Sequence, residues 1–475
     1  MARMAWHAFL SSLVNQDPNM SLYHVLMHFW LHFANGEAMI RFLSAAAGAA
    51  TIPVVYLTGL RLFDARVGLL ASLLMAFNLF HIQYSQEARS YGVWVLLCSA
   101  STFFFIRSME ESRPAHWTWY CVTAVLAIYA HIYAFLVIAS QLVSVLTMDK
   151  RRSHIRAVIA SAATISLFSA PLLLLFYLRL KSPFIQLNWV PRANLRRVYD
   201  LFYTLSGNAN FYGIEVIKLR SGKLLLIMCL ACALVAFVQG MWIWKRSGCS
   251  SESWRWLLAF FCLAGPIVLS LCISLRVPLF LNRYLLVCVP PLCIVTARGI
   301  LSIKRRWLSL ALVSAFLACE TAALVQYIHY RSRYGEWRTA TREILLDHHP
   351  GDAIVFSMAH GRLLFDYYRN QERPSSSDLD EVYPDLSRAA TDPQALSYYP
   401  EPTTMQLAKL MRQERVWLIV YPEDMATDAV MSKRFQSLLS AEFSKVEIKK
   451  IDTIRMCLYS RESTAPVASS PLRHE

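Results

Sequence analysis

The sequence predicts a mainly α-helical, polytopic membrane protein: a transmembrane helical bundle followed by a small α/β domain outside the cytoplasm. Of its 475 residues, 56% are hydrophobic, whereas soluble domains have roughly 45–50%. Only 17% are charged, against about 25% in soluble proteins. The apolar residues are concentrated between residues 39 and 328, and the sequence beyond about 330 has an ordinary soluble composition.

Apolar segments long enough to cross a bilayer recur along this region. A spanning helix needs about 20 mostly apolar residues, because the hydrocarbon core is about 30 Å thick. The candidates are 39–61, 67–83, 88–107, 116–130, 132–148, 155–178, 222–244, 255–275, 282–301 and 306–328. The fourth and fifth are short and meet at Ala130-His131, so they could also form one bent element.

Basic residues alternate between the predicted loops. Every second loop carries Lys or Arg: Arg61 and Arg66; Arg107 and Arg113; Lys150, Arg151, Arg152 and Arg156; Lys245, Arg246 and Arg255; Lys304, Arg305 and Arg306. The short loops near 84–88 and 131 carry neither. Since cytoplasmic loops are enriched in these residues, residues 1–38 and 329–475 are both expected outside. No helix precedes residues 1–38 to carry them across, so the chain is expected to lack an upstream first helix.

The predicted outer loop 179–221 departs from this alternation. It carries several basic residues, listed here: Arg179, Lys181, Arg192, Arg196, Arg197, Lys218 and Arg220. Two explanations stay open. The loop binds an anionic ligand at the membrane surface, or it is a longer loop that crosses despite its charge.

The net charge of +15 does not indicate nucleic-acid binding, because the basic residues lie mostly in short loops between apolar segments. Most of the 11 cysteines lie inside those segments. Cys229 and Cys232 form a C-x-x-C pair, but it stands alone in an apolar helix. Packing is therefore expected there, rather than zinc binding, redox chemistry or a disulfide framework.

Residues 1–38 are predicted to form an extracytoplasmic interfacial segment. Aromatic and apolar residues recur there at helical spacing after Asp17, which is typical of a helix lying in the membrane surface. His24, His28 and His32 share one helix face. A surface stripe is favoured over a metal site, because no carboxylate or Cys stands at ligand spacing.

Two further polar clusters lie at helix ends on the predicted outer side. The run from Tyr84 to Tyr91 places Glu87 and Arg89 between two apolar spans, where charge is costly and usually functional. Arg283 begins an otherwise apolar helix and can bind phosphate through two parallel hydrogen bonds. A structural ion pair in the first cluster and a topological arginine in the second are the alternatives.

At these segments the sequence resembles the GT-C-fold, polyprenyl-phosphate-dependent glycosyltransferases related to protein O-mannosyltransferases and bacterial lipid A aminoarabinose transferases. D-P-N-M-S-L-Y-H, beginning at Asp17, is similar to the family's acidic-Pro-Pro-Leu-Tyr-Tyr segment. The other matching runs are Y-S-Q-E-A-R-S-Y at 84–91, Y-A-H-I-Y-A at 129–134 and N-R-Y at 282–284. The resemblance covers roughly residues 1–330.

The resemblance implies a glycosyltransferase that moves a hexose or pentose from a polyprenyl-phosphate-linked sugar to an acceptor glycan, lipid or protein. It implies a multi-pass protein of the bacterial inner membrane, with membrane lipid as a partner and no cofactor or metal. Arg89 and Arg283 would bind the donor phosphate, and Asp17 and Glu87 would be the catalytic carboxylates. The substrate pocket would be lined by Tyr23, Tyr84, Tyr91, His131 and Tyr284.

Two departures from the family leave alternatives open. The family carries an Asp-Glu pair in its first outer loop, and Met1–Trp6 looks like the helix that would follow this pair. The family's Pro-Pro is Asn19-Met20 here. A catalytically impaired family member is therefore a further possibility, as is a transporter or flippase of lipid-linked sugars. The absence of internal repeats and the one-sided charged clusters favour an enzyme over a transporter.

The boundaries predicted from composition are an interfacial segment at 1–38, a membrane domain at 39–328, an α/β domain at 329–462 and a disordered tail at 463–475. Strands are expected at 353–356, 416–420 and 456–459, and helices near 336–347, 403–414 and 429–441. The Ser-, Pro- and Asp-rich stretch 371–402 is expected to be loop. This domain could recognise the acceptor or form a passive cap.

Overall fold

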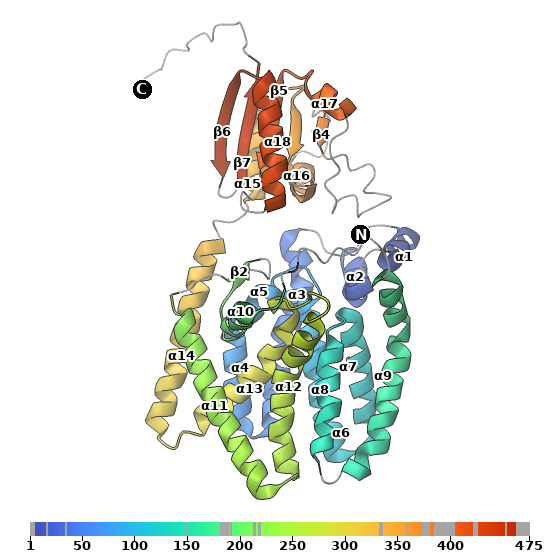
Figure 1. Ribbon diagram of the computed structural model, residues 1–475, viewed down its shortest axis with the longest axis vertical. Helices are drawn as coiled ribbons and strands as arrows, with labels where there is room; N and C mark the ends of the chain where they lie inside the picture. Colours follow the sequence, from blue (N-terminus) through green and yellow to red (C-terminus); the bar gives the residue numbers. More distant parts are fainter. Residues whose placement is uncertain are drawn as a thin grey trace. The chain divides into compact units, whose positions relative to one another are not determined.

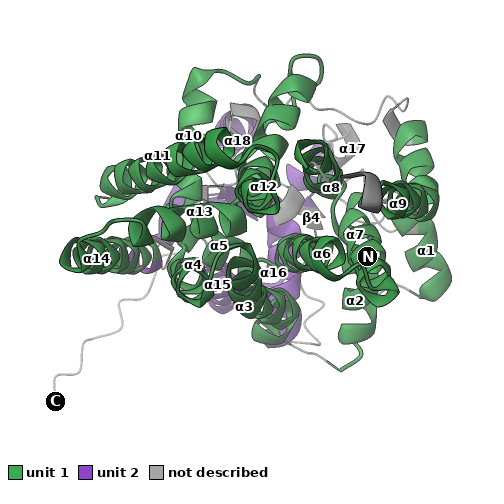
Figure 2. Ribbon diagram, turned by 90° about the horizontal axis from the view of Figure 1, so that it is seen from below, with its two compact units in different colours: residues 1–327 green, residues 328–475 purple. Residues whose placement is uncertain are grey.

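The computed structural model describes residues 5–15, 18–33, 36–148, 151–180, 190, 192–211, 215–216, 220–331, 336–357, 359–372, 381–383, 404–420, 426–451 and 454–461. The chain forms two compact units, residues 1–327 and residues 328–475 (Figure 2). The first is a helical bundle and the second is an α/β sandwich (Figure 1). The predicted fold class is thereby confirmed.

The bundle begins with short helices and continues with longer apolar ones. Its elements up to the first long connection are α1 (Trp6–Asn15), η1 (Pro18–Met20), α2 (Ser21–Trp30), α3 (Glu37–Leu62), α4 (Ala65–Phe77), α5 (Leu79–Ser85), α6 (Tyr91–Glu111), α7 (Pro114–Ala130), α8 (Ala134–Ser144), η2 (Val145–Thr147) and α9 (Arg151–Leu180). The remaining elements are α10 (Leu195–Leu205), β1 (Asn210–Phe211), β2 (Glu215–Val216), α11 (Gly222–Ser247), α12 (Ser251–Ser274), η3 (Asn282–Cys288), α13 (Val289–Leu301) and α14 (Arg306–Arg331).

Every predicted apolar segment is helical among the described residues. In the part of the chain that the structure describes, seven helices are long and apolar enough to cross a membrane, and α4 with α5 gives an eighth candidate that bends by 60°. The segments predicted at 116–130 and 132–148 are two separate helices, α7 with 17 residues and the shorter α8 continued by η2. The prediction of ten membrane-spanning helices therefore remains a prediction.

The helices of the bundle are interrupted at three places, and two of these interruptions have an identifiable cause. Asn78 adopts an extended conformation and its side chain accepts a hydrogen bond from the His81 backbone N–H, so it ends α4 and caps α5. His131 is extended between α7 and α8. Pro290 and Pro291 lack the N–H groups that would donate to carbonyls four residues earlier, and the preceding η3 keeps 3₁₀ geometry.

The second unit is built on a five-stranded mixed sheet in the order β4-β3-β5-β7-β6. Strands β3 (Ala353–Phe356), β4 (Glu381–Tyr383) and β5 (Arg415–Val420) are parallel, while β7 (Ile454–Ser460) is antiparallel to both β5 and β6 (Lys445–Ile451). The helices are α15 (Trp337–Asp347), α16 (Ala359–Glu372), α17 (Thr404–Leu410) and α18 (Ala426–Glu442). The predicted strands are present, whereas α16, β4 and β6 were not predicted.

Alternate side chains of the sheet fill two separate cores. Ile354, Phe356 and Trp417 pack with α15 and α16 on one face. Val355 and Leu418 pack with α17 and α18 on the other. The period-two pattern of the strands therefore explains why helices cover both faces. The predicted loop at 371–402 falls mostly outside the described residues, and the tail 463–475 does so entirely.

Candidate functional site

Four of the predicted pocket residues form one aromatic cluster at an end of the bundle. Tyr84 of α5 meets Tyr91, the first residue of α6, with ring centroids 5.0 Å apart. His131, at the α7–α8 break, lies 6.0 Å from Tyr91 and 5.1 Å from Tyr284 of η3. Tyr84, Tyr91 and His131 are almost completely buried. Segments that are far apart in the sequence therefore meet at these rings.

Arg283 is the cation of this cluster. Its guanidinium lies 5.5 Å from the centroid of the Tyr284 ring, and its charge interacts with the phenol groups of Tyr91, Tyr84 and Tyr284. The side chain is half-buried. A guanidinium held among hydroxyl groups, with part of its surface exposed, is suited to bind an anion such as a phosphate.

Glu87 and Arg89 lie in the loop between α5 and α6, next to the same cluster. Both interact electrostatically with Tyr91, as Arg283 does. Glu87 is half-buried and Arg89 is exposed. Arg283, from a distant part of the sequence, thus lies near enough to Tyr91 to affect it electrostatically, as the neighbouring Glu87 and Arg89 do. Their roles stay predictions.

Ser44 of α3 connects the Glu87–Arg89 loop to the N-terminal helices. Its hydroxyl donates to the carbonyl oxygen of Arg89 at 2.9 Å. The hydroxyl of Tyr23 on α2 lies 3.0 Å from the same Ser44 oxygen and is the donor of that pair. Burial raises the pKa of Tyr23 to about 12, so its phenol stays protonated at neutral pH. Tyr23 is therefore a neutral support for the loop.

The N-terminal segment also contacts the break at His131. Asn19 accepts a hydrogen bond from the backbone N–H of Ile132 at 2.9 Å, and Ser21 donates to the carbonyl of Tyr129 at 3.3 Å. Two runs that carry the family resemblance therefore touch each other. Asp17 lies outside the described residues, so its predicted catalytic role stays a prediction.

Several residues at this end were not predicted. Trp94 stacks on His131 with centroids 4.4 Å apart, and the hydroxyl of Tyr133 donates to the Leu279 carbonyl at 2.6 Å, tying α8 to the segment before η3. Tyr133 lies in the Y-A-H-I-Y-A run, which could have drawn attention to it. Trp94 and Ser44 sit within apolar helices, and no signal in the sequence singles them out.

Of the predicted surface histidine stripe, His32 is exposed, whereas His28 is buried against α1, so the prediction is wrong for His28. His28 stacks on Phe9 with ring centroids 4.6 Å apart and lies 5.1 Å from Trp6. Among the residues that the structure describes, no group of three or more His, Cys, Asp or Glu side chains is arranged to hold a metal ion. Cys229, of the C-x-x-C pair, contacts the hydroxyl of Thr296 instead.

Ion pairs gather at the opposite end of the same helices. Glu110, near the end of α6, lies 2.8 Å from Arg255 of α12 and 3.5 Å from Arg61 of α3. Glu111 pairs with Arg107 at 2.7 Å. Three of the loops predicted to be on one side of the membrane therefore meet at one end of the bundle. The 21 residues of α6 separate this end from Tyr91 by roughly 30 Å.

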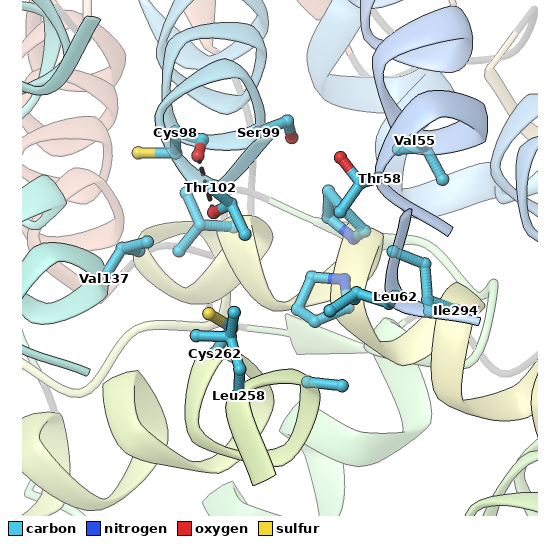
Figure 3. Close-up of a pocket in the computed structure, with 14 residues that line it drawn as sticks. Val55, Thr58, Leu62, Cys98, Ser99, Thr102, Val137, Leu258, Cys262 and Ile294 are labelled. Atoms are coloured by element: carbon cyan, nitrogen blue, oxygen red, sulfur yellow. Dashed lines mark hydrogen bonds between the residues drawn. The ribbon is translucent and has the colours of Figure 1, made fainter. Parts of the chain in front are cut away.

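A small cavity lies among the helices of the bundle (Figure 3). Its volume is about 30 Å³, which is room for a water molecule or two. Apolar side chains such as Val55, Leu62 and Ile294 line it, together with Thr58 and Cys262. The space is too small for a sugar or a lipid chain. We place the candidate site at the aromatic cluster because of the charged side chains beside it.

Comparison with known proteins agrees with this architecture. Residues 20–175 match the family of dolichyl-phosphate-mannose-protein mannosyltransferases. The crystal structure of ArnT from Cupriavidus metallidurans bound to undecaprenyl phosphate matches 93% of this chain and 87% of that chain, with 13% identity and a TM-score of 0.58. The apo structure of the same protein matches 95% of this chain and 91% of that chain, with the same identity and TM-score. No curated protein matches the sequence.

The match to ArnT extends over both units, and at 13% identity it is a likeness of fold. The match to the mannosyltransferase family covers the N-terminal part of the bundle, including the Tyr84–Tyr91 run and His131. The resemblance predicted from the sequence is confirmed: this is a multi-pass membrane protein with the GT-C fold of polyprenyl-phosphate-dependent glycosyltransferases.

Proposed function

We propose that this protein is a membrane glycosyltransferase that takes a sugar from a polyprenyl-phosphate donor and passes it to an acceptor on the extracytoplasmic side of the bacterial inner membrane. One observation carries the proposal. Arg283, Arg89 and Glu87 all act on Tyr91, at the end of the bundle opposite the basic loops. The undecaprenyl phosphate named for ArnT and the dolichyl-phosphate mannose named for the matching family support a lipid-borne phosphate as the ligand.

The chemistry of such a transfer fits these side chains. An oxygen of the acceptor attacks the anomeric carbon, and the bond from that carbon to the phosphate oxygen breaks. The polyprenyl phosphate leaves as an anion, so the site must supply cations rather than a strong acid. Arg283 and Arg89 take that role. The acceptor's proton passes to a carboxylate acting as general base, and Glu87 is the described carboxylate at the cluster.

The surrounding rings complete the proposed pocket. Tyr284 contacts the Arg283 guanidinium, and Tyr84 and Tyr91 lie near enough to act on its charge, which would favour a defined phosphate position. His131 would line the proposed pocket, and Tyr23 would support it through Ser44. Asp17 would lie at the acceptor entrance. The polyprenyl tail would lie along the lipid-exposed surfaces of the helices.

The basic loops orient the bundle in this proposal. The end that carries Arg61, Arg107 and Arg255 would face the cytoplasm, because such residues are enriched in cytoplasmic loops. The aromatic cluster would then face outward, where lipid carriers rather than nucleotides supply activated sugars.

The experiment is sugar transfer by the full chain reconstituted in vesicles with a panel of defined polyprenyl-phosphate sugars. Arg283→Ala is compared with Arg276→Ala, a matched control that removes an exposed arginine seven positions earlier in the sequence. We expect Arg283→Ala to lower turnover by roughly 100-fold, as loss of a transition-state donor does, and Arg276→Ala to leave it unchanged.

Three results would count against the proposal. Wild-type turnover in Arg283→Ala would remove the phosphate assignment. Movement of the lipid across the bilayer with no sugar transferred would favour a flippase. Loss of activity on treatment with a chelator would show that a metal ion takes the place we give to arginine.

A further inference from the structure

Glu320 is an acidic residue in the middle of α14, which is otherwise an apolar, membrane-crossing helix. It lies on the stripe of α14 that faces the bundle, together with Phe316, Ala323 and Tyr327. Its side chain is 3% exposed, and its Oε2 atom has no hydrogen-bond partner among the described residues. An ionisable group at such a depth is costly and usually has a function. The proposed transfer does not use it.

The carboxyl group lies against the turn that follows α10. A Cβ atom added to Gly207 would be 3.3 Å from Oε1 of Glu320 and 3.6 Å from Nδ2 of Asn78. Gly207 has a φ of +104°, a conformation that glycine adopts at little cost. Glu320, the Gly207 turn and the α4–α5 break at Asn78 therefore form one packed unit.

The last residues of α10, which lead into the Gly207 turn, are hydrogen-bonded to both halves of the candidate site. Asn78 donates through Nδ2 to the Leu205 carbonyl at 3.0 Å, and its Oδ1 caps α5, the helix that carries Tyr84 and leads to Glu87. On the other side, Asn282 donates through Nδ2 to the hydroxyl oxygen of Thr204 at 3.0 Å. Asn282 directly precedes Arg283. A shift of the turn would thus move both the cation and the carboxylate.

The surroundings of Glu320 favour an uncharged carboxyl group. Among the described residues, no Lys, Arg or His forms an ion pair with it. The titratable groups near enough to be affected by its charge are the thiols of Cys229 on α11, Cys293 on α13 and its neighbour Cys319. A buried carboxylate with no cation costs several kcal/mol, whereas a neutral carboxylic acid does not bear that cost.

We propose that Glu320 is a positioning residue that holds the Gly207 turn as an uncharged carboxylic acid, and thereby fixes Asn282 beside Arg283 and the start of α5. The effect on sugar transfer rests on the proposed function. The placement of the turn and the protonation of Glu320 do not depend on the proposed function. They are therefore tested by measurements other than activity.

The test uses the full-length protein with Glu320→Gln, Glu320→Ala and Gly207→Ala. Infrared difference spectra of wild type minus Glu320→Gln report the C=O band of a protonated carboxylic acid. Hydrogen exchange reports on residues 204–209 and 281–286. We expect the band in wild type at neutral pH, faster exchange of both segments in Glu320→Ala and Gly207→Ala, and wild-type exchange in Glu320→Gln, whose amide is uncharged and of the same size.

Sugar transfer is measured in parallel. It should fall by roughly 10- to 100-fold in Glu320→Ala, as a small displacement of reacting groups does, and be retained in Glu320→Gln. An infrared band of a carboxylate in place of the carboxylic acid band would overturn the inference. Wild-type hydrogen exchange in both Glu320→Ala and Gly207→Ala would also overturn it. If the wild-type chain transfers no sugar, the proposed function fails, and the infrared and exchange results still decide the role of Glu320.

Discussion

Nδ1 of His131 accepts a hydrogen bond from the backbone N–H of Tyr133 at 3.2 Å. A ring nitrogen that accepts carries no proton, so the neutral imidazole bears its proton on Nε2. Nε2 has no partner among the described residues, and the ring is completely buried among Trp94, Tyr91 and Tyr284. His131 therefore presents one N–H donor within the aromatic cluster.

Two substitutions of His131 should distinguish the contribution of its N–H donor from that of the packed ring. We expect His131→Ala to lower sugar transfer by roughly 10- to 100-fold, because it removes the donor and the stacking partner of Trp94. His131→Gln should retain more activity, since its amide N–H₂ can reach the position of Nε2. Steady-state transfer rates with the same donor decide this. Equal rates for His131→Gln and His131→Ala would show that only the ring matters.

Gly92 sets the approach of α6 to α3 next to the site. A Cβ atom there would lie 2.5 Å from the carbonyl oxygen of Ser44, the residue that holds the Arg89 loop. Gly92→Ala should therefore push the two helices apart and lower the free energy of unfolding by about 1–3 kcal/mol. Denaturant unfolding in detergent measures the loss. Ser44→Ala separates the two effects, because it removes the hydrogen bonds to Arg89 and Tyr23 without adding volume. Unchanged stability in Gly92→Ala would show that the contact between the two helices is not tight.

The ion pairs at the opposite end should affect stability without affecting the site. Glu110→Gln weakens contacts with both Arg61 and Arg255, and we expect it to cost about 1 kcal/mol of stability. Binding of polyprenyl phosphate should be unchanged, because roughly 30 Å of helix lies between the two ends. A loss of lipid binding equal to that of Arg283→Ala would contradict the separation of the two ends.

Asp352 organises the start of the sheet in the second unit. The carboxylate is 2% exposed, pairs with Arg415 at 3.2 Å and accepts hydrogen bonds from the Trp417 indole and the His349 backbone, both at 3.0 Å. Asp352→Asn should lower the stability of this unit by about 3 kcal/mol, because it leaves the arginine uncompensated. Faster hydrogen exchange of β3 and β5, with α6 unchanged, is the expected result. An exchange pattern identical to wild type would show that the charge is not needed.

Apolar segment length and composition predicted most of the helical bundle. What they missed was the bend at Asn78, since a polar residue inside an apolar run looks like a tolerated substitution. Its side chain caps α5, which is a signal that local sequence contains. Glu320 was also overlooked, although an acidic residue within a span is itself a functional indication. In the second unit, β6 was missed because its side chains are mostly exposed and its sequence lacks an apolar run.

Part of the candidate site could be predicted from the sequence. The Tyr84–Tyr91 run and Arg283 stood out as charges at helix ends, and the structure brings them together. The contributions of Ser44, Trp94 and Thr204 depend on which helices pack against each other. That packing follows from close contacts such as the one at Gly92, which a single sequence does not reveal.

The central claim is that Arg283 and Arg89 bind one lipid-borne phosphate. The most direct measurement is the affinity of the full chain for polyprenyl phosphate, compared among wild type, Arg89→Ala, Arg283→Ala, the double variant and the Arg276→Ala control. Each hydrogen bond to a charged group is worth about 1.5–3 kcal/mol, so each single variant should bind more than about tenfold more weakly. The double variant should lose less than the sum of the two single losses, because both arginines contact the same anion. Wild-type affinity in Arg283→Ala, or strictly additive losses, would contradict the account.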